Sequence, residues 1–414
     1  MKCIYIIMDG VGDLPSSKLD GLTPLQAAKK PNIDSLANAG VTGLMDVYSP
    51  GIPVGTDIGH ICLFGYDAQK VYSGRGPIEA IGAGLSLSPG DIAFRGNFAT
   101  IDENGILIDK RAGRINKKTD QLIADLSKIQ LKNGIKFTIK QATEHRFVVI
   151  FHGIKNFPTI ADAYPGHKCK LPCKFPWSFA LDNDSKSSDF AFTINEFIRN
   201  ATKILANHNV NTERMNKNLL PANTILLRGG GQFREFEKFS DKFYGVSAGI
   251  VAAEDTVLGL AKMASIESIK RKGMTGGYDT NYNIKAQSCI ELLKTKDLVF
   301  LHVKATDLAS HDKLPMKKKE IIEHIDLMIK VICDNIDASN TMIAIASDHS
   351  TPCLYGEHTA DPVPILLSGP NLRKDITKSY DEISAMSGGL GRIKGKDFIR
   401  ILLSSGNFIP KYGD

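Results

Sequence analysis

No stretch of this 414-residue chain is apolar over the roughly 20 residues that a membrane-crossing helix needs. The apolar run that begins at Cys3 already ends at Asp9, which makes it too short for a secretory signal. Internal repeats and low-complexity tracts are absent as well. These absences predict a globular, cytoplasmic protein with no membrane partner.

Cysteine and unbalanced charge are also scarce. The seven cysteines are an odd number without a secretory signal, which indicates reduced thiols rather than a disulfide framework. The 51 basic and 45 acidic residues leave a net charge of +6, dispersed along the chain. Nucleic-acid binding usually needs a more clustered positive charge, so we expect no nucleic-acid partner. A small anionic substrate is compatible with this balance.

Short, continuous apolar runs predict strands that are buried on both faces. They cover residues 3–8, 297–304, 341–346 and 363–368. Helical patterns occur over residues 23–39, where Pro24 and Pro31 are start signals, and over 317–335, where apolar residues form one stripe. Strands that alternate with helices predict an α/β fold, with a mainly parallel sheet flanked by helices.

The middle of the chain has a different texture. In the stretch FRGNFATIDENGILID, a Glu-Asn-Gly tripeptide separates two runs of alternating polarity, which is typical of a β-hairpin. We therefore predict an inserted α+β domain over residues 85–247, between segments 1–84 and 248–414.

Aspartate and histidine residues follow three of the predicted strands. The carboxyl ends of parallel strands meet at one edge of a sheet, where ligands bind. Each residue alone could cap a helix or form an ordinary ion pair, but together they supply the oxygen and nitrogen ligands that zinc or manganese prefers. Six such ligands suffice for two ions, which can clamp a phosphoryl group during in-line transfer. The six are Asp9, Asp307, His311, Asp348, His349 and His358.

Phosphoryl transfer also requires a nucleophile. The turn-rich loop PGIPVG precedes a predicted helix start, where backbone N–H groups can hold an anion. Thr56 or Asp57 could simply cap that helix. A hydroxyl bound to a metal loses its proton more readily, so Thr56 is our candidate nucleophile and an additional metal ligand.

These residues lie in motifs that resemble a known family. The stretches MDGVGD, TPLQAA, PGIPVGTDIGH, GRGPIEAIGAG, RAGRIN, VKATDLASHD and SDHSTPC are similar to those of archaeal-type 2,3-bisphosphoglycerate-independent phosphoglycerate mutases, within the alkaline phosphatase superfamily. The resemblance runs over about residues 1–400. It implies an alkaline-phosphatase-like metal domain, residues 1–84 and 248–414, interrupted by a substrate-binding domain, residues 85–247.

The resemblance also implies the reaction. Such an isomerase interconverts 3-phosphoglycerate and 2-phosphoglycerate in glycolysis and gluconeogenesis through a phospho-enzyme, here phosphothreonine at Thr56. It implies two divalent ions, for which manganese, zinc, cobalt and magnesium all remain open. Asp307, His311 and His358 would hold one ion. The other ion would be held by Asp9, Thr56, Asp348 and His349.

A phosphorylated acid calls for guanidinium and other polar partners. Within the family-like motifs, the candidates for substrate binding are Arg75, Arg95, Arg111, Arg114, His145, Arg146 and Asp162, with Lys285 and Lys304 as weaker cationic candidates. The absence of an Arg-His-Gly motif near the N-terminus predicts that no 2,3-bisphosphoglycerate is needed. A homo-oligomer is compatible with the sequence.

The chain departs from the family pattern at three positions. Thr56 replaces the usual serine, Tyr164 stands at a usually acidic position, and Leu258 stands where a basic residue is common. These changes leave two other functions open. One is a metal-dependent phosphohydrolase or a different phosphomutase of the superfamily, and the other is a non-catalytic binding protein.

Overall fold

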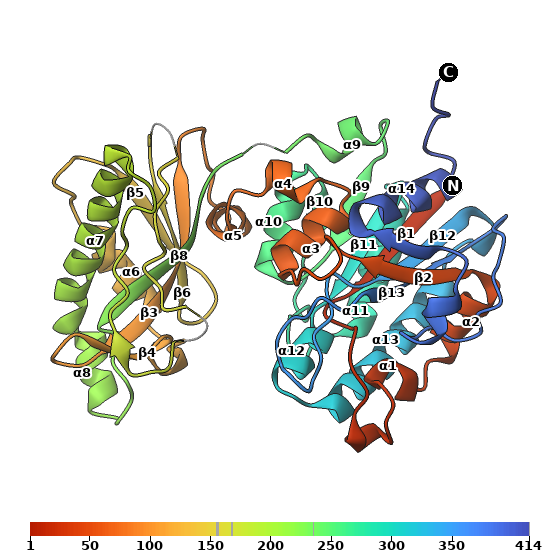
Figure 1. The fold of residues 1–414 in the computed structure, drawn as a ribbon, viewed down its shortest axis with the longest axis horizontal. Helices are drawn as coiled ribbons and strands as arrows, with labels where there is room; N and C mark the ends of the chain where they lie inside the picture. The colour runs from red at the N-terminus through yellow and green to blue at the C-terminus, as the bar shows by residue number, and fades with distance from the viewer. Residues whose placement is uncertain (155–156, 167–168, 235, 414) are drawn as a thin grey trace. The chain divides into compact units, whose positions relative to one another are not determined.

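The computed structural model describes residues 1–414 except 155–156, 167–168, 235 and 414 (Figure 1). The chain forms two compact units, Met1–Tyr72 with Glu235–Asp414 and Ser73–Arg234. The chain therefore passes between units at residues 72/73 and 234/235, whereas we expected domain boundaries at 84/85 and 247/248. None of the described helices combines the length and apolarity needed to span a membrane.

An eight-stranded sheet organises the first unit, in the order β10-β9-β11-β1-β12-β13-β2-β14. The central strand β1 pairs in parallel with β11 and β12, and β13 runs antiparallel to both of its neighbours. The prediction of a mainly parallel α/β sheet is confirmed. The strands are β1 (Lys2–Met8), β2 (Val41–Asp46), β9 (Ala248–Val251), β10 (Glu267–Ile269), β11 (Leu298–Val303), β12 (Thr341–Ala346), β13 (Val363–Ser368) and β14 (Gly391–Lys394).

Both faces of this sheet are covered, which explains the continuous apolar runs. Ile4 and Ile6 belong to one buried cluster with residues of α11 and α13. Tyr5 points the other way and packs edge-on against Phe398 of α14, with ring centroids 5.5 Å apart. The helices of this unit are α1 (Pro24–Ala27), α2 (Pro31–Ala39), α3 (Thr56–Leu63), α4 (Ala68–Val71), α9 (Phe239–Lys242), α10 (Asp255–Met263), α11 (Tyr282–Leu293), α12 (Ala305–His311), α13 (Pro315–Cys333) and α14 (Gly395–Ser405).

The helical pattern of residues 23–39 is divided into α1 and α2. Lys30 has φ −132° and ψ 57°, outside the helical region, because the ring of Pro31 disfavours a helical conformation at the preceding residue. Pro24 and Pro31 each lie at the start of a helix, as expected. The prediction of helix over the whole of 23–39 was wrong only at this junction.

A second sheet organises the unit Ser73–Arg234, in the order β5-β6-β3-β4-β7, and β8 also pairs with β3, in the antiparallel sense. The predicted hairpin is confirmed, since β3 and β4 pair antiparallel around Glu-Asn-Gly. Phenylalanines from β3, β6 and α7 form much of its core. The elements are β3 (Ile92–Ile101), β4 (Ile106–Asp109), β5 (Phe137–Gln141), β6 (Arg146–Phe151), β7 (Cys173–Lys174), β8 (Thr224–Gln232), α5 (Arg75–Gly82), α6 (Thr119–Leu126), α7 (Ser185–Ala206) and α8 (Asn209–Met215).

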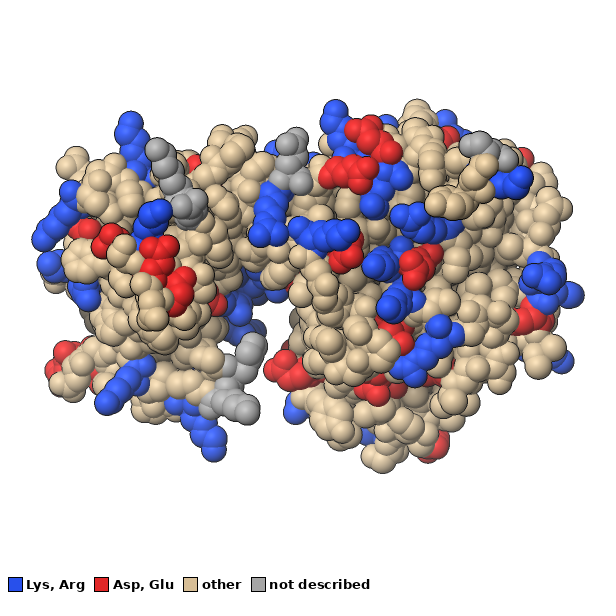
Figure 2. Space-filling model, turned by 45° about the horizontal axis from the view of Figure 1, so that its top comes forward, with Lys and Arg blue, Asp and Glu red and all other residues tan. Residues whose placement is uncertain are grey.

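Charged side chains are mixed on the surface. Figure 2 shows lysine and arginine side chains dispersed among acidic ones over the face in view. This distribution agrees with the even spread of basic and acidic residues along the sequence.

Candidate functional site

Three parallel strands of the first unit bring acidic residues to one edge of the sheet. Asp9 directly follows β1, Asp307 lies in α12 after β11, and Asp348 follows β12. The register aligns Met8 with Val303 and Ile7 with Ala346, so the three chain segments leave the sheet side by side. All three carboxylates are at most 1% exposed.

Two groups of donor atoms form at this edge. In the first, one atom each from Asp307, His311 and His358 lies within 4.8 Å of the others. The second contains Asp9, Asp307 and His349. The first group is the set expected for one ion. In the second, Asp307 takes the place expected for Asp348, whose Oδ2 nevertheless lies 3.3 Å from His349 Nε2.

Backbone and side-chain partners orient the histidines. Nδ1 of His311 lies 2.7 Å from the carbonyl oxygen of Gly356, and Nδ1 of His358 lies 2.8 Å from that of Val54. Each Nε2 is thereby turned toward Asp307, at 3.3 Å and 3.7 Å respectively. Such outer partners fix the ring orientation of metal-binding histidines.

Thr56 is the first residue of α3, and its side chain is buried beside these groups. Its Oγ1 lies 3.4 Å from His349 Nε2 and accepts a hydrogen bond from Lys304 Nζ at 3.2 Å. Gly55 occupies the N-cap position of α3, so the alternative that Thr56 or Asp57 caps this helix does not hold. The Thr56 hydroxyl is therefore directed at the donor cluster instead of at the helix backbone.

Lys304 is the cation among the three carboxylates. Its Nζ contacts Asp307 Oδ2 at 2.6 Å and Asp9 Oδ1 at 3.1 Å. Burial alone would lower the pKa of Lys304, but these carboxylates outweigh burial and raise it well above its ordinary value. The same ion pair keeps the pKa of Asp307 well below its usual range despite burial.

The donor set fits divalent cations. Three buried carboxylates face one ammonium, and burial together with the Asp348 carboxylate raises the pKa of Asp9 well above its ordinary value. A bound divalent cation would supply the positive charge that these carboxylates lack. Burial lowers the pKa of His349 to about 3, which keeps its imidazole neutral and able to act as a ligand. Asp348 Oδ2 is buried and accepts no hydrogen bond from any residue that the structure describes.

A cluster of arginines forms in the second unit, around Glu79. Glu79 Oε1 accepts a hydrogen bond from Arg75 Nε at 2.7 Å and forms an ion pair with Arg95 Nη1 at 3.0 Å. The sheet register places Arg228 of β8 opposite Arg95 of β3. Arg146 of β6 lies opposite Asn97, two residues further along β3. Burial lowers the pKa of Arg95 to about 9, and the other arginines act in the same direction. Four guanidinium groups and one carboxylate leave a net positive charge here, and forked guanidinium donors suit a multiply charged anion.

The remaining substrate-binding candidates have different surroundings. His145 is 3% exposed, and burial together with nearby arginines, including Arg111 and Arg114, lowers its pKa to about 4. Asp162 accepts a hydrogen bond from the backbone N–H of Gly229 at 2.9 Å, next to Arg228. Lys285 belongs to the first unit, is 1% exposed and donates to the carbonyl oxygen of His302 at 2.9 Å.

Comparisons with known proteins identify the family. Residues 37–211 match the family described as 2,3-bisphosphoglycerate-independent phosphoglycerate mutase. A protein of that name from Pyrococcus abyssi is 42% identical over 100% of this chain and 99% of its own length. The chain belongs to the family of 2,3-bisphosphoglycerate-independent phosphoglycerate mutases. A mutase of the same name from Saccharolobus solfataricus is also 42% identical, over 100% of this chain and 99% of its own.

Solved structures agree with the family assignment. A protein from Pyrococcus horikoshii superposes with a TM-score of 0.87 and 37% identity, covering 100% of this chain and 99% of its own. The cofactor-independent phosphoglycerate mutase from Thermoplasma acidophilum gives a TM-score of 0.69 and 31% identity, covering 98% of this chain and 100% of its own.

Sequence reasoning missed three members of these clusters. His302 lies within β11, and its Nε2 is 2.9 Å from Asp9 Oδ2. Glu79 could have been found from its position four residues after Arg75, a spacing that forms an ion pair on a helix. Arg228 gave no local signal, because only the pairing of β3 with β8 brings it to Arg95.

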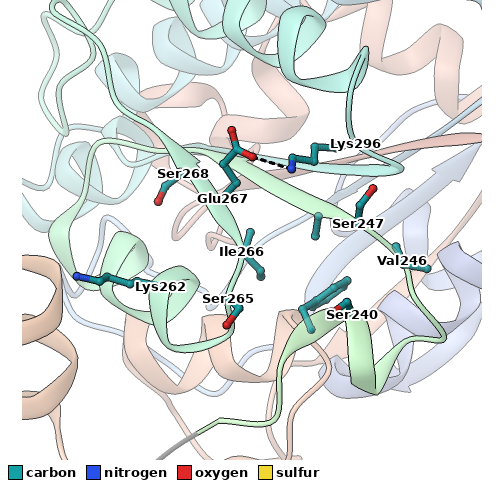
Figure 3. Close-up of a pocket in the computed structure, with 11 residues that line it drawn as sticks. Ser240, Val246, Ser247, Lys262, Ser265, Ile266, Glu267, Ser268 and Lys296 are labelled. Carbon is teal, nitrogen blue, oxygen red and sulfur yellow. Dashed lines mark ion pairs between the residues drawn. The ribbon is translucent and has the colours of Figure 1, made fainter. Parts of the chain in front are cut away.

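A separate cavity of about 490 Å³ lies by the edge strand β10 (Figure 3). Its lining includes Ser247, Ser265 and Ser268. The ammonium of Lys296 is paired with Glu267 at 2.6 Å. None of the predicted metal ligands lines this cavity, so its volume alone does not make it the functional site.

Proposed function

We propose that this chain interconverts 3-phosphoglycerate and 2-phosphoglycerate without 2,3-bisphosphoglycerate, through phosphothreonine at Thr56. The observation that carries the proposal is the position of Thr56 Oγ1, buried between Lys304 Nζ and His349 Nε2 at the edge where three aspartates meet. Family membership supports the reaction, and the seven free thiols support a reducing, cytoplasmic location.

The donor groups suit two divalent ions, which would be manganese, zinc, cobalt or magnesium. Asp307, His311 and His358 would hold one. Asp9, Thr56, Asp348 and His349 would hold the other. When bound, such ions supply Lewis-acid stabilisation of the charge that develops on the phosphoryl oxygens.

The chain's own residues account for the order of bond changes. Thr56 Oγ loses its proton and attacks phosphorus, while the bond from phosphorus to a glycerate oxygen breaks and that oxygen takes up a proton. The other glycerate hydroxyl then loses its proton and its oxygen attacks the phosphothreonine. The bond from phosphorus to Oγ breaks, and Oγ takes up a proton, which restores the Thr56 hydroxyl. Lys304 lies 3.2 Å from Thr56 Oγ1, so its ammonium can stabilise negative charge on that oxygen in both steps.

A mutase must retain glycerate while Thr56 carries the phosphate. We propose that the arginine cluster around Glu79, with Arg111, Arg114 and His145, binds the carboxylate and phosphate of the substrate. Arg95 Nε, Arg146 Nε and Arg228 Nε are buried and have no hydrogen-bond partner among the described residues. Buried donors of this kind favour an anionic partner that can satisfy them.

The experiment couples 2-phosphoglycerate formation to a downstream enzyme and follows Thr56→Ala and Thr56→Ser in parallel. Thr56→Ser should stay active because it keeps the reacting oxygen, and Thr56→Ala should lose nearly all turnover while remaining folded. Mass spectrometry of the trapped intermediate should find phosphate on residue 56. Inorganic phosphate as the main product would indicate a phosphohydrolase instead, and full rate only with added 2,3-bisphosphoglycerate would contradict the proposal.

A further inference from the structure

Lys318 is a fully buried lysine in α13 whose ammonium is surrounded by acceptors. Its side chain is 0% exposed. Nζ donates to Asp13 Oδ2 at 2.8 Å and to the carbonyl oxygens of Gly10 at 2.9 Å, Thr351 at 3.2 Å and Gly12 at 3.4 Å. Only one of these four acceptors carries a charge. Carbonyl and carboxylate oxygens converging on a point charge resemble the binding site of a small monovalent cation.

The acceptors belong to the two loops that carry predicted metal ligands. Gly10 directly follows Asp9, and Thr351 lies two residues after His349. These loops also bond to each other, since the N–H of Thr351 donates to the carbonyl oxygen of Gly12 at 3.0 Å. Lys318 therefore links the segment after β1 to the segment after β12 through hydrogen bonds to both.

Thr351 connects this ammonium to the donor atoms. Its carbonyl oxygen faces Lys318, while its hydroxyl donates to Asp307 Oδ1 at 2.9 Å and lies 2.8 Å from His349 Nδ1. A shift of the Thr351 backbone would move a hydrogen bond to two predicted ligands at once. None of the four acceptors of Lys318 is itself a predicted ligand or nucleophile side chain.

We propose that Lys318 is a positioning residue that acts as a built-in monovalent cation and sets the spacing of the metal-binding donors. The inference rests on the proposed function, because it assumes that those donors bind metal. Without the ammonium, the Asp13 carboxylate and three carbonyl groups would lose their shared partner inside the protein. The two loops would then separate or take up a cation from solution.

Calorimetric titration with Mn²⁺ tests the proposal on the apoprotein. Lys318→Met should fold, as judged by circular dichroism, and bind Mn²⁺ about 10- to 100-fold more weakly, the range typical for partners of metal ligands. The kcat at limiting Mn²⁺ should fall while the KM for 3-phosphoglycerate stays unchanged. The matched control is Lys317→Met, because Lys317 is the adjacent residue and its ammonium contacts Glu320 at 2.8 Å and the Tyr278 ring at 5.8 Å from the centroid, away from the metal-ligand loops.

Chemical rescue separates a cation role from simple packing. Lys318→Ala leaves space at the ammonium position, so ammonium ions should restore part of the Mn²⁺ affinity and tetramethylammonium should not. If Lys318→Met fails to fold, Lys318→Met combined with Asp13→Asn removes both buried charges and should show the same weakened Mn²⁺ binding.

Three results would overturn the inference. The first is a folded Lys318 variant with wild-type Mn²⁺ affinity. The second is an Mn²⁺ affinity of Lys318→Ala that both amines restore equally. The third is failure of all the variants to fold even with ammonium, which would make Lys318 a core residue only. Wild-type protein that binds no Mn²⁺ would instead overturn the metal site of the proposed function.

Discussion

Replacement of Glu79 by glutamine should lower the stability of the second unit but leave its arginines able to bind an anion. The Glu79 side chain is 10% exposed, and its Oε1 serves both Arg75 and Arg95. Removing one partner of a buried ion pair costs about 3–5 kcal/mol. Glutamine retains the acceptor oxygen, so we expect Glu79→Gln to lower the free energy of unfolding by about 3 kcal/mol, the lower end of that range.

Added phosphate should return much of this loss. In Glu79→Gln the four arginines have no carboxylate among them, so a bound anion replaces the missing charge and stabilises the folded state by mass action. Urea denaturation at neutral pH, with and without phosphate, measures both effects. Phosphate should raise the midpoint of Glu79→Gln more than that of the wild type, and Glu103→Gln, at an exposed position, is the control.

The pH dependence gives a second check on Glu79. Despite burial, Arg95 and Arg75 hold the pKa of Glu79 below its ordinary value of about 4.5. Its stabilising contribution is therefore complete above that ordinary value and is lost as the pH falls through the folded-state pKa. Glu79→Gln should lack this loss. An unchanged midpoint at neutral pH, with equal phosphate effects in variant and wild type, would refute the reasoning.

Three other outcomes can be measured. Chelation with EDTA should abolish mutase activity and lower the Tm of the wild type, and Mn²⁺ should reverse both; activity that survives exhaustive chelation would exclude a metal mechanism. Burial lowers the pKa of Lys285 from 10.5 to about 8, so the free energy of unfolding should rise by up to about 3 kcal/mol as the pH rises between these values. In denaturation series, Lys285→Met should lack this rise with pH. An equal dependence of stability on pH in variant and wild type would contradict the prediction. Arg228→Lys should raise the KM for 3-phosphoglycerate more than it lowers kcat, because lysine lacks the guanidinium fork; steady-state kinetics with unchanged KM would remove Arg228 from substrate binding.

The fold of the first unit could be predicted because its strands are buried on both faces. Runs such as residues 3–8 have no charged residue to interrupt them. The helix-forming segments are marked by the prolines of residues 23–39 and by the apolar stripe of residues 317–335. The direction of β13 could not be predicted, since a short apolar run reads the same in a parallel or an antiparallel strand. The break between α1 and α2 could have been predicted, because proline disfavours a helical conformation at the residue before it.

The aspartates at the sheet edge could be predicted from the sequence, whereas the arginine cluster around Glu79 could be predicted only in part. Asp9, Asp307 and Asp348 were predictable because each follows a strand, and parallel strands end at a common edge. The arginine cluster depends on cross-strand pairing instead. Arg95 and Arg228 are brought together only by the antiparallel register of β3 and β8, which no local pattern specifies. Glu79 and His302 have their significance through these neighbours rather than through any motif.

Lys304 connects the electrostatics of the first unit to its chemistry. One ammonium contacts Asp9, Asp307 and the Thr56 hydroxyl, so the same side chain that partly neutralises the carboxylates also touches the predicted nucleophile. The single ammonium leaves the pKa of Asp9 raised well above its ordinary value, through burial and the Asp348 carboxylate, and a divalent cation would relieve that repulsion. An uncharged residue at position 304 would raise the negative charge around Thr56, which should strengthen cation binding while it disfavours the approach of an anionic phosphate. Lys304→Met should therefore bind Mn²⁺ at least as tightly as the wild type and yet turn over 3-phosphoglycerate more slowly, whereas loss of Mn²⁺ binding would show that Lys304 mainly holds the donors in place.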